Sequence, residues 1–265
     1  MTRTPTWGVQ SGAMGAKPEQ ALLAALADLP VRVERMRIVP FAHVPADPPP
    51  VLDGPVFVYG STGILSCARS LGWAPGGWDG APFSQQATLA AYGPLALNHA
   101  ALPTTWDQAA AAARAAGWGR VFVRPDSEGK AFPGRVLALD ALDAFAASLV
   151  EAEHPDATGT PVVVAPVQDI SAEWRLFVVD GQVVAASLYA VDRAPTTAPG
   201  APDDVVAFGM ALAARFAPGP AFALDVARTD AGLRVVETNS ASSAGFYAAD
   251  VPAFARAITG LLGRV

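Results

Sequence analysis

The chain has 265 residues, of which 52% are hydrophobic and 16% charged, and its 24 acidic against 18 basic residues give a net charge of −6. So much apolar material with so little charge excludes an intrinsically disordered chain, and the length allows about two domains. An acidic chain without a basic block argues against binding to nucleic acid or an anionic membrane, because both need a positive surface. Cys67 is the single cysteine, which excludes an intrachain disulfide and a thiolate metal cluster.

The sequence predicts neither a secretion signal nor a membrane span. Met1 to Gln10 lack the apolar core of a secretion signal. The longest uncharged run, Ala81 to Trp106, is interrupted by Gln85, Pro94 and Pro103, whereas a spanning helix needs about 20 mostly apolar residues. We therefore expect a cytoplasmic protein.

The first third of the chain predicts a small α/β unit. Leucines at helical spacing indicate an amphipathic helix over Glu19 to Leu29, and a strand is expected over Val31 to Pro40. Pro55 to Tyr59 has the composition of a buried strand, and it leads through Gly60–Gly63 into a helix that ends near Leu71.

The middle third alternates helices with short apolar strands. A helix capped by Thr105 or Asp107 and ending at Ala116 is expected before the strand Val121–Val123. A polar loop, Arg124 to Gly134, follows this strand, and a further helix runs from Asp140 to about Glu153. Pro161 to Val167 then predicts a β-branched strand.

The last third predicts hairpins and two helices. Two alternating runs around Asp180-Gly181 indicate a hairpin from Arg175 to Ser187. A helix over Asp203–Phe216, strands over Phe222–Arg228 and Leu233–Glu237, and a last helix opened by Pro252 complete the chain. The fold class expected from this order is a mixture of α and β.

Three oxygen-bearing side chains lie on the last pair of predicted strands. Asp225 interrupts an apolar strand, and Glu237 and Asn239 share a face of the next one because they are two positions apart. If the strands pair through their short turn, Asp225 can lie opposite Glu237. Carboxylate and amide oxygens suit Mg²⁺. The alternative is that all three are strand-end polar residues on a solvated face.

Three further segments carry polar residues next to predicted strands. Arg124 and Lys130, with glycines between and after them, suit a phosphate tail, unless this is an ordinary exposed loop. The strand from Pro161 could offer backbone groups to a purine, with Asp169 near a ribose, or it could be a plain edge strand. Glu173 and Arg175 share a face, either as a structural ion pair or with Arg175 clamping a phosphoryl oxygen.

The order of these segments resembles the ATP-grasp superfamily of ATP-dependent carboxylate ligases. The resemblance covers about Leu97 to Val265, and it is closest to a clade in which an arginine, here Arg124, replaces the first nucleotide-binding lysine. The stretches that carry it are VFVRPDSEGKAFPG, PVVVAPVQDISAEWRLFVVDGQVVAAS, FALDVAR and VVETNS. The loop GKAFPG departs from the serine-bearing glycine run of many members, which weakens the expected phosphate cradle.

The resemblance implies a role for each matching residue. Arg124 would hold the α- and β-phosphates of ATP, Lys130 would reach toward the β- or γ-phosphate, and Arg175 would stabilise the acyl phosphate. The residues implied around adenine and ribose are Val164, Ala165, Val167, Asp169 and Glu173. The residues implied as ligands of one or two Mg²⁺ are Asp225, Glu237 and Asn239.

The implied architecture is an α+β ATP-grasp fold whose two lobes enclose ATP. Residues 1–96 would form an α/β domain that precedes the grasp, and residues 97–265 the grasp itself, with a nucleotide lobe (97–165) and a metal lobe (166–265). The implied activity joins a small-molecule or peptide carboxylate to an amine through an acyl phosphate, with release of ADP and phosphate. The substrates and the oligomeric state stay open.

Three other functions compete with ligation. A protein of the same fold could bind ATP as a kinase or as a non-catalytic module, with the same residues. The turn Gly60–Gly63 could open a dinucleotide-binding unit, although its glycine spacing is incomplete. The loop from Gly72 to Gly80, which holds Trp73 and Trp78, could be a recognition surface or could cover the core.

Overall fold

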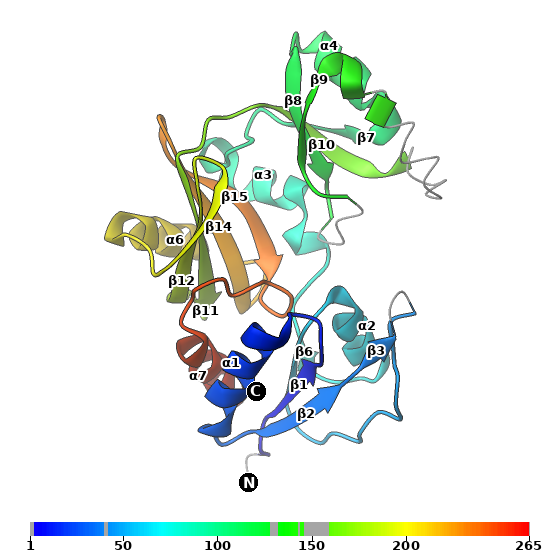
Figure 1. Ribbon diagram of the computed structural model, residues 1–265, viewed down its shortest axis with the longest axis vertical. Coiled ribbons are helices and arrows are strands. Elements are labelled where there is room, and N and C mark those ends of the chain that lie inside the picture. The colour runs from blue at the N-terminus through cyan, green and yellow to red at the C-terminus, as the bar shows by residue number, and fades with distance from the viewer. Residues whose placement is uncertain (1–2, 40–41, 128–131, 143, 146–158, 265) are drawn as a thin grey trace.

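The fold is built on three larger sheets that follow one another along the long axis of the molecule (Figure 1). The computed structural model describes residues 3–39, 42–127, 132–142, 144–145 and 159–264. In that part of the chain, helices and strands alternate as the sequence predicts. No helix within these residues is long and apolar enough to cross a bilayer.

The first sheet is parallel, with the strand order β2-β1-β5-β6. Its core strand β5 is buried at all four positions, which explains its uninterrupted apolar sequence. Helices α1 and α2 pack on it, and two short strands, β3 and β4, form a separate ladder. The bounds are β1 (Thr6–Gln10), α1 (Ala16–Ala27), β2 (Arg32–Met36), β3 (Ile38–Val39), β4 (Val44–Pro45), β5 (Val56–Tyr59), α2 (Thr62–Ser70) and β6 (Pro75–Gly76).

The tryptophan-rich loop covers the core. Trp73 is buried against the first sheet, and Trp78 packs on Phe57 with ring centroids 5.8 Å apart. At the turn before α2, Ser61 caps the helix by accepting a hydrogen bond from the Gly63 amide. Gln10 accepts bonds from both the amide and the hydroxyl of Ser61, so this turn is occupied by local contacts.

The second sheet is antiparallel, with the order β7-β10-β8-β9. One face packs on α4, and the other carries Phe122 and Arg124, because alternate residues of β8 point to opposite faces. Strand β10 lies inside this sheet, so the expectation of a plain edge strand is wrong. The bounds are β7 (Leu102–Thr105), α4 (Ala109–Ala115), β8 (Arg120–Pro125), β9 (Arg135–Ala138) and β10 (Pro161–Pro166).

The third sheet is antiparallel, with the order β13-β12-β11-β14-β15. Helices α6 and α3 cover one face through Leu176, Leu224 and their neighbours. The turn Asp180-Gly181 joins β11 to β12 as predicted. The bounds are α3 (Gln85–Tyr92), β11 (Ala172–Val179), β12 (Gln182–Val191), β13 (Ala194–Pro199), α6 (Asp203–Arg215), β14 (Ala221–Thr229), β15 (Gly232–Ser240) and α7 (Val251–Leu262).

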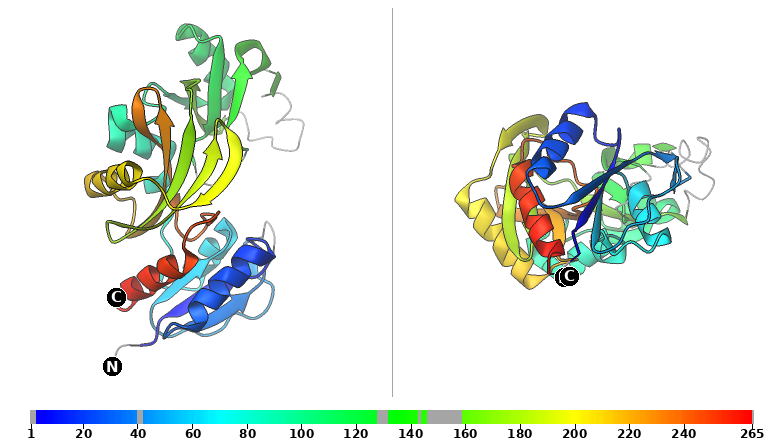
Figure 2. Two further views of the ribbon diagram at one scale, coloured as in Figure 1. Left: turned by 60° about the vertical axis from the view of Figure 1, so that its left-hand side comes forward. Right: turned by 90° about the horizontal axis from the view of Figure 1, so that it is seen from below.

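One apolar core joins the first sheet to the third. Trp7 and Phe57 of the first sheet belong to the same buried cluster as Phe177 of β11 and Phe254 of α7. Figure 2 shows α7 beside α1, below the third sheet. The expected domain boundary between residues 96 and 97 stays a prediction, and this cluster contains residues from both sides of it.

Several elements were not predicted from the sequence, among them α3, β7, β9 and β13. The N-cap of α3 had a recognisable signal, since the Ser84 hydroxyl accepts a hydrogen bond from the Ala87 amide at 3.0 Å. Thr105 takes the N-cap position of a short 3-10 turn, Trp106–Gln108, but without a side-chain cap bond, and α4 itself begins at Ala109, after both predicted cap residues. Most of the helix expected from Asp140 onward lies outside the described residues.

Substitution by alanine is expected to change the stability of the protein in opposite directions at two helical glycines. A Cβ at Gly209 of α6 would lie 2.3 Å from the Cδ1 of buried Leu176, whereas a Cβ at Gly260 of α7 meets no described atom within 4 Å. We expect Gly209→Ala to lower the free energy of unfolding by about 1–3 kcal/mol and Gly260→Ala to raise it by about 0.5–1 kcal/mol. Urea unfolding measures both, and a shift of both variants in one direction would contradict this account of the helix packing.

Candidate functional site

Three charged residues form one row across the third sheet. The strand register pairs Arg175 of β11 with Asp225 of β14, and Asp225 with Glu237 of β15. Directly opposed residues have Cβ atoms about 4.5–5.5 Å apart on one face of a sheet. Their face looks away from α6, because the alternate residues Leu176 and Leu224 occupy the core beneath that helix. The register thus brings Asp225 and Glu237 together as predicted.

Arg175 and Asp225 form a two-pronged ion pair. The Nε of Arg175 donates to Oδ1 of Asp225 at 2.8 Å, and its second terminal nitrogen donates to Oδ2 at 2.7 Å. Both side chains are buried. Burial alone would lower the pKa of Arg175, but Asp225 raises the pKa overall. Arg175 therefore holds its charge, and it pairs with Asp225 rather than with Glu173, so the predicted Glu173–Arg175 ion pair is wrong.

The row is extended by an arginine from the second sheet. Arg124 of β8 donates to Oε2 of Glu237 in a buried ion pair. The loop that follows β8 is held as well, because Asp126 accepts a hydrogen bond from the Gln86 amide at the start of α3. Two cations and two carboxylates from two sheets thus meet in a line.

A tyrosine pair borders this row. The Tyr189 hydroxyl donates to Oε2 of Glu173 at 2.8 Å, and Tyr189 stacks on Tyr247 with ring centroids 5.1 Å apart. The guanidinium carbon of Arg175 lies 5.2 Å from the centroid of the Tyr247 ring. Burial raises the pKa of Glu173, and Asp225 and Glu237 raise it further, although the Tyr189 hydrogen bond opposes them. Burial, more than the neighbouring charges, therefore disfavours the ionised form of Glu173.

The donor set of the third sheet fits a hard divalent cation. Asp225, Glu237 and Asn239 supply only oxygen ligands of the kind that Mg²⁺ prefers. Asn239 is buried, and its side-chain nitrogen, a donor, has no hydrogen-bond partner among the described residues, so it can donate to an acceptor of an incoming group, while its amide oxygen is the atom suited to a cation. An ionised carboxylate has about four lone-pair positions, which leaves acceptor capacity beyond the arginines. Within the described ranges no three His, Cys, Asp or Glu side chains are grouped for a metal.

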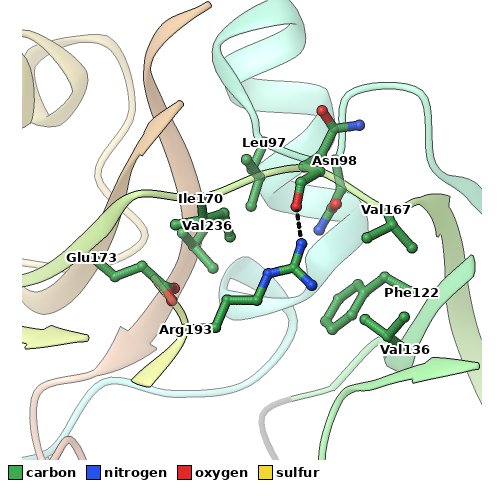
Figure 3. A pocket seen from close by; sticks show the side chains of 10 residues that line it. Leu97, Asn98, Phe122, Val136, Val167, Ile170, Glu173, Arg193 and Val236 are labelled. Atoms are coloured by element: carbon green, nitrogen blue, oxygen red, sulfur yellow. Dashed lines mark hydrogen bonds between the residues drawn. The ribbon is translucent and has the colours of Figure 1, made fainter. Parts of the chain in front are cut away.

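A cavity with mostly apolar walls lies beside Glu173. Its volume is about 200 Å³, smaller than the roughly 300–1,000 Å³ typical of small-molecule sites. Figure 3 shows side chains from both sheets and from the segment before β7 around it. Its lining residues are Leu97, Asn98, Phe122, Val136, Val167, Gln168, Ile170, Glu173, Arg193 and Val236. Most of these were not predicted, because isolated apolar residues carry no chemical signal in a sequence.

Only some of the residues that were predicted around adenine and ribose line this cavity. Val167 and Glu173 line the cavity. Ala165 is buried and lies opposite Phe122 in the strand register, whereas Val164 packs in the core beneath α4. The Asp169 side chain is exposed outside this lining and lies 3.5 Å from Arg193. Lys130 lies outside the described residues.

Comparison with solved structures identifies the fold. D-cycloserine synthetase DcsG matches with a TM-score of 0.68 at 15% identity, over 97% of this chain and 99% of its own. ATP-grasp ligase PsnB, solved with a phosphomimetic variant of its minimal precursor, Mg and ADP, gives 0.61 at 16%, over 99% and 100%. D-alanine–D-alanine ligase from Bacillus anthracis gives 0.62 at 12%, over 98% and 92%. At these identities the matches speak for the fold alone.

A family model supplies the sequence-level evidence. It is described as ATP-grasp domain, R-2-K clade family 3, and it matches residues 68–258, well over half of the chain. A search of curated proteins gives no match. The family match confirms the resemblance and the α+β ATP-grasp fold that the sequence predicted. The chain belongs to the ATP-grasp superfamily, within its R-2-K clade.

Proposed function

We propose that the protein is an ATP-dependent ligase that activates a carboxylate as an acyl phosphate and joins it to an amine. The observation that carries the proposal is the charged row of Arg175, Asp225 and Glu237, tied across two sheets by Arg124. It combines oxygen ligands for a cation with guanidinium groups for phosphates. The names of the solved relatives agree with it: one is a synthetase, two are ligases, and the PsnB complex contains Mg and ADP.

Each part of the row has its own task. Asp225, Glu237 and Asn239 would hold Mg²⁺, which would neutralise charge on the triphosphate when bound. Arg124 binds the α- and β-phosphates through charge-assisted hydrogen bonds. By the family resemblance, Lys130, which lies outside the described residues, would reach toward the β- or γ-phosphate. Arg175 stabilises the charge that develops on the transferring phosphoryl group, because a preorganised buried donor needs little reorganisation.

The nucleotide base belongs in the cavity beside the row. Val167 follows strand β10 in the connection between the two lobes and would offer backbone groups to adenine, next to Val164 and Ala165 within the strand. Glu173 lines the same cavity (Figure 3) and would contact the ribose side of the nucleotide. Asp169 is the second candidate for the ribose, reached from outside the present lining.

The reaction proceeds in two displacements. A carboxylate oxygen of the substrate attacks the γ-phosphorus of ATP, the bond to the β-phosphate oxygen breaks, and ADP leaves. The amine then attacks the acyl carbon of the acyl phosphate, loses a proton, and expels inorganic phosphate. The side chains position the reactants and neutralise charge, so no protein nucleophile is needed.

A substrate screen tests the proposal. Candidate amino acids and peptides are supplied as carboxylate and amine with ATP and Mg²⁺, ADP release is measured, and products are identified by mass. With a productive carboxylate and hydroxylamine in place of the amine, we expect an acyl hydroxamate. ATP binding without any carboxylate-dependent ADP release would favour the kinase or the non-catalytic module instead.

A further inference from the structure

The turn between β12 and β13 has a strained backbone. The register pairs Val191 with Ala194, so the turn consists of Asp192 and Arg193 alone. Both have positive φ angles, 47° for Asp192 and 65° for Arg193. Two-residue hairpin turns of this kind favour Asn or Asp followed by Gly, because a side chain is disfavoured in the left-handed region.

The neighbouring hairpin of the same sheet follows that preference. Between β11 and β12 the turn residues are Asp180 and Gly181, with φ angles of 52° and 74°. The two turns thus share positive φ angles at both positions, and Arg193 stands where the other hairpin has a glycine. A bulky side chain kept in a sparsely populated backbone region points to a use for that side chain.

The Arg193 side chain extends into the cavity that was assigned above to the nucleotide base. Its terminal nitrogen donates to the Gln168 carbonyl at 2.6 Å, on the segment that connects the two lobes. Figure 3 shows the guanidinium between Glu173 and Phe122. Arg193 also exerts an attraction on Glu173 that lowers the pKa of that carboxyl, against the larger effect of burial, which raises it. The turn is therefore tied to the cavity by its side chain.

The cavity pairs this planar cation with apolar walls. Leu97, Phe122 and Val236 supply hydrocarbon surface from three different segments. A flat guanidinium facing such walls suits a flat aromatic ring better than a phosphate, since Arg stacks on π-systems while the walls take up the apolar face. A phosphate in this cavity would lose its hydrating water to apolar walls, and Arg193 alone could not satisfy all of its oxygens.

We propose that Arg193 is a base-binding residue, whose guanidinium stacks on the purine of the bound nucleotide and closes the cavity over it. The bond to the Gln168 carbonyl holds the guanidinium in place. This inference rests on the proposed function, because it takes ATP as the ligand of the cavity. It adds a nucleotide contact from a turn that lies outside every stretch that carried the family resemblance.

Nucleotide affinity and stability test the inference together. For Arg193→Gly we expect the Kd for ATP to rise about five- to thirtyfold, while the Kd for inorganic tripolyphosphate, which has no base, stays within about twofold. The melting temperature of the free protein should equal or exceed that of the wild type, because glycine relieves the strain. Arg193→Lys, which keeps the charge without the planar surface, should also weaken ATP binding.

Asp192→Gly is the matched control. It places glycine in the same turn and leaves Arg193, and its side chain is absent from the lining of the cavity, so ATP affinity should be unchanged. An equal loss of affinity for ATP and tripolyphosphate in Arg193→Gly would overturn the assignment in favour of a phosphate contact. Wild-type ATP affinity with a lowered melting temperature would overturn it in favour of a structural clamp. A wild-type protein that binds no ATP would refute the proposed function itself.

Discussion

Glu237→Gln is expected to lower Mg²⁺-dependent ATP turnover about a thousandfold or more, because it removes an anionic oxygen from the centre of the charged row. Glutamine keeps the shape of the side chain and an acceptor for Arg124. Alanine would instead leave that buried guanidinium without Glu237, at a cost of about 3–5 kcal/mol in stability. ADP release as a function of Mg²⁺ concentration measures the effect, and a melting curve shows whether the fold survives.

Glu34→Gln is the control for this experiment. Glu34 pairs with Arg32 at the surface of the first sheet, where the arginine side chain is 52% exposed. Exposed pairs contribute about 0–1 kcal/mol, so turnover and melting temperature should both stay at wild-type levels. Wild-type turnover in Glu237→Gln would remove Glu237 from the metal site and with it the central premise of the proposed function.

Arg175→Lys is expected to lower kcat about a hundred- to a thousandfold while changing the affinity for ATP by less than about threefold. Lysine retains a positive charge for Asp225, which is 1% exposed, but it cannot reproduce the two parallel hydrogen bonds of the guanidinium. The loss falls on turnover because the contact to the phosphoryl group strengthens as charge develops. Single-turnover rates and equilibrium ATP binding separate the two quantities.

Arg228→Lys provides the comparison for Arg175. Arg228 also donates to both oxygens of a carboxylate, Asp204, but through a single terminal nitrogen and at an exposed position. We expect kcat to be unaffected there. If Arg175→Lys weakened ATP binding as much as it slowed turnover, Arg175 would hold ATP in the ground state rather than assist the transfer.

The local geometry of the third sheet could be predicted in part from the sequence. The Asp-Gly turn predicted the β11–β12 hairpin, and the short turn before Gly232 predicted the β14–β15 hairpin. Regular pairing from that second turn would put Asp225 opposite Val236, and a bulge between Asp225 and Val226 places it opposite Glu237 instead. The two hairpins depend on residues close in sequence, where strand alternation and turn chemistry decide the outcome, whereas the bulge that sets the final register is not given by these rules.

Contacts between the sheets could not be predicted in this way. Arg124 and Glu237 are separated by 113 positions, and no local rule shows that a strand-end arginine meets that glutamate. The walls of the cavity, such as Leu97 and Phe122, look in the sequence like any other core residue. The turn at Arg193 has a local sequence feature, because Asp192-Arg193 stands between two strands where Asp-Gly is the preferred turn. This turn is absent from the sequence predictions, since strand β13 is not predicted.

The cluster shared by the first sheet, β11 and α7 determines how the chain can be divided. A cut after residue 96 would leave Trp7 and Phe57 on one fragment and Phe177 and Phe254 on the other. Each piece would then present a water-repelling surface to solvent and tend to aggregate, unless its counterpart were made alongside it. Residues 1–96 and 97–265 therefore depend on each other for stability. Cleavage of the chain after residue 96 would be tolerated far better than removal of either fragment.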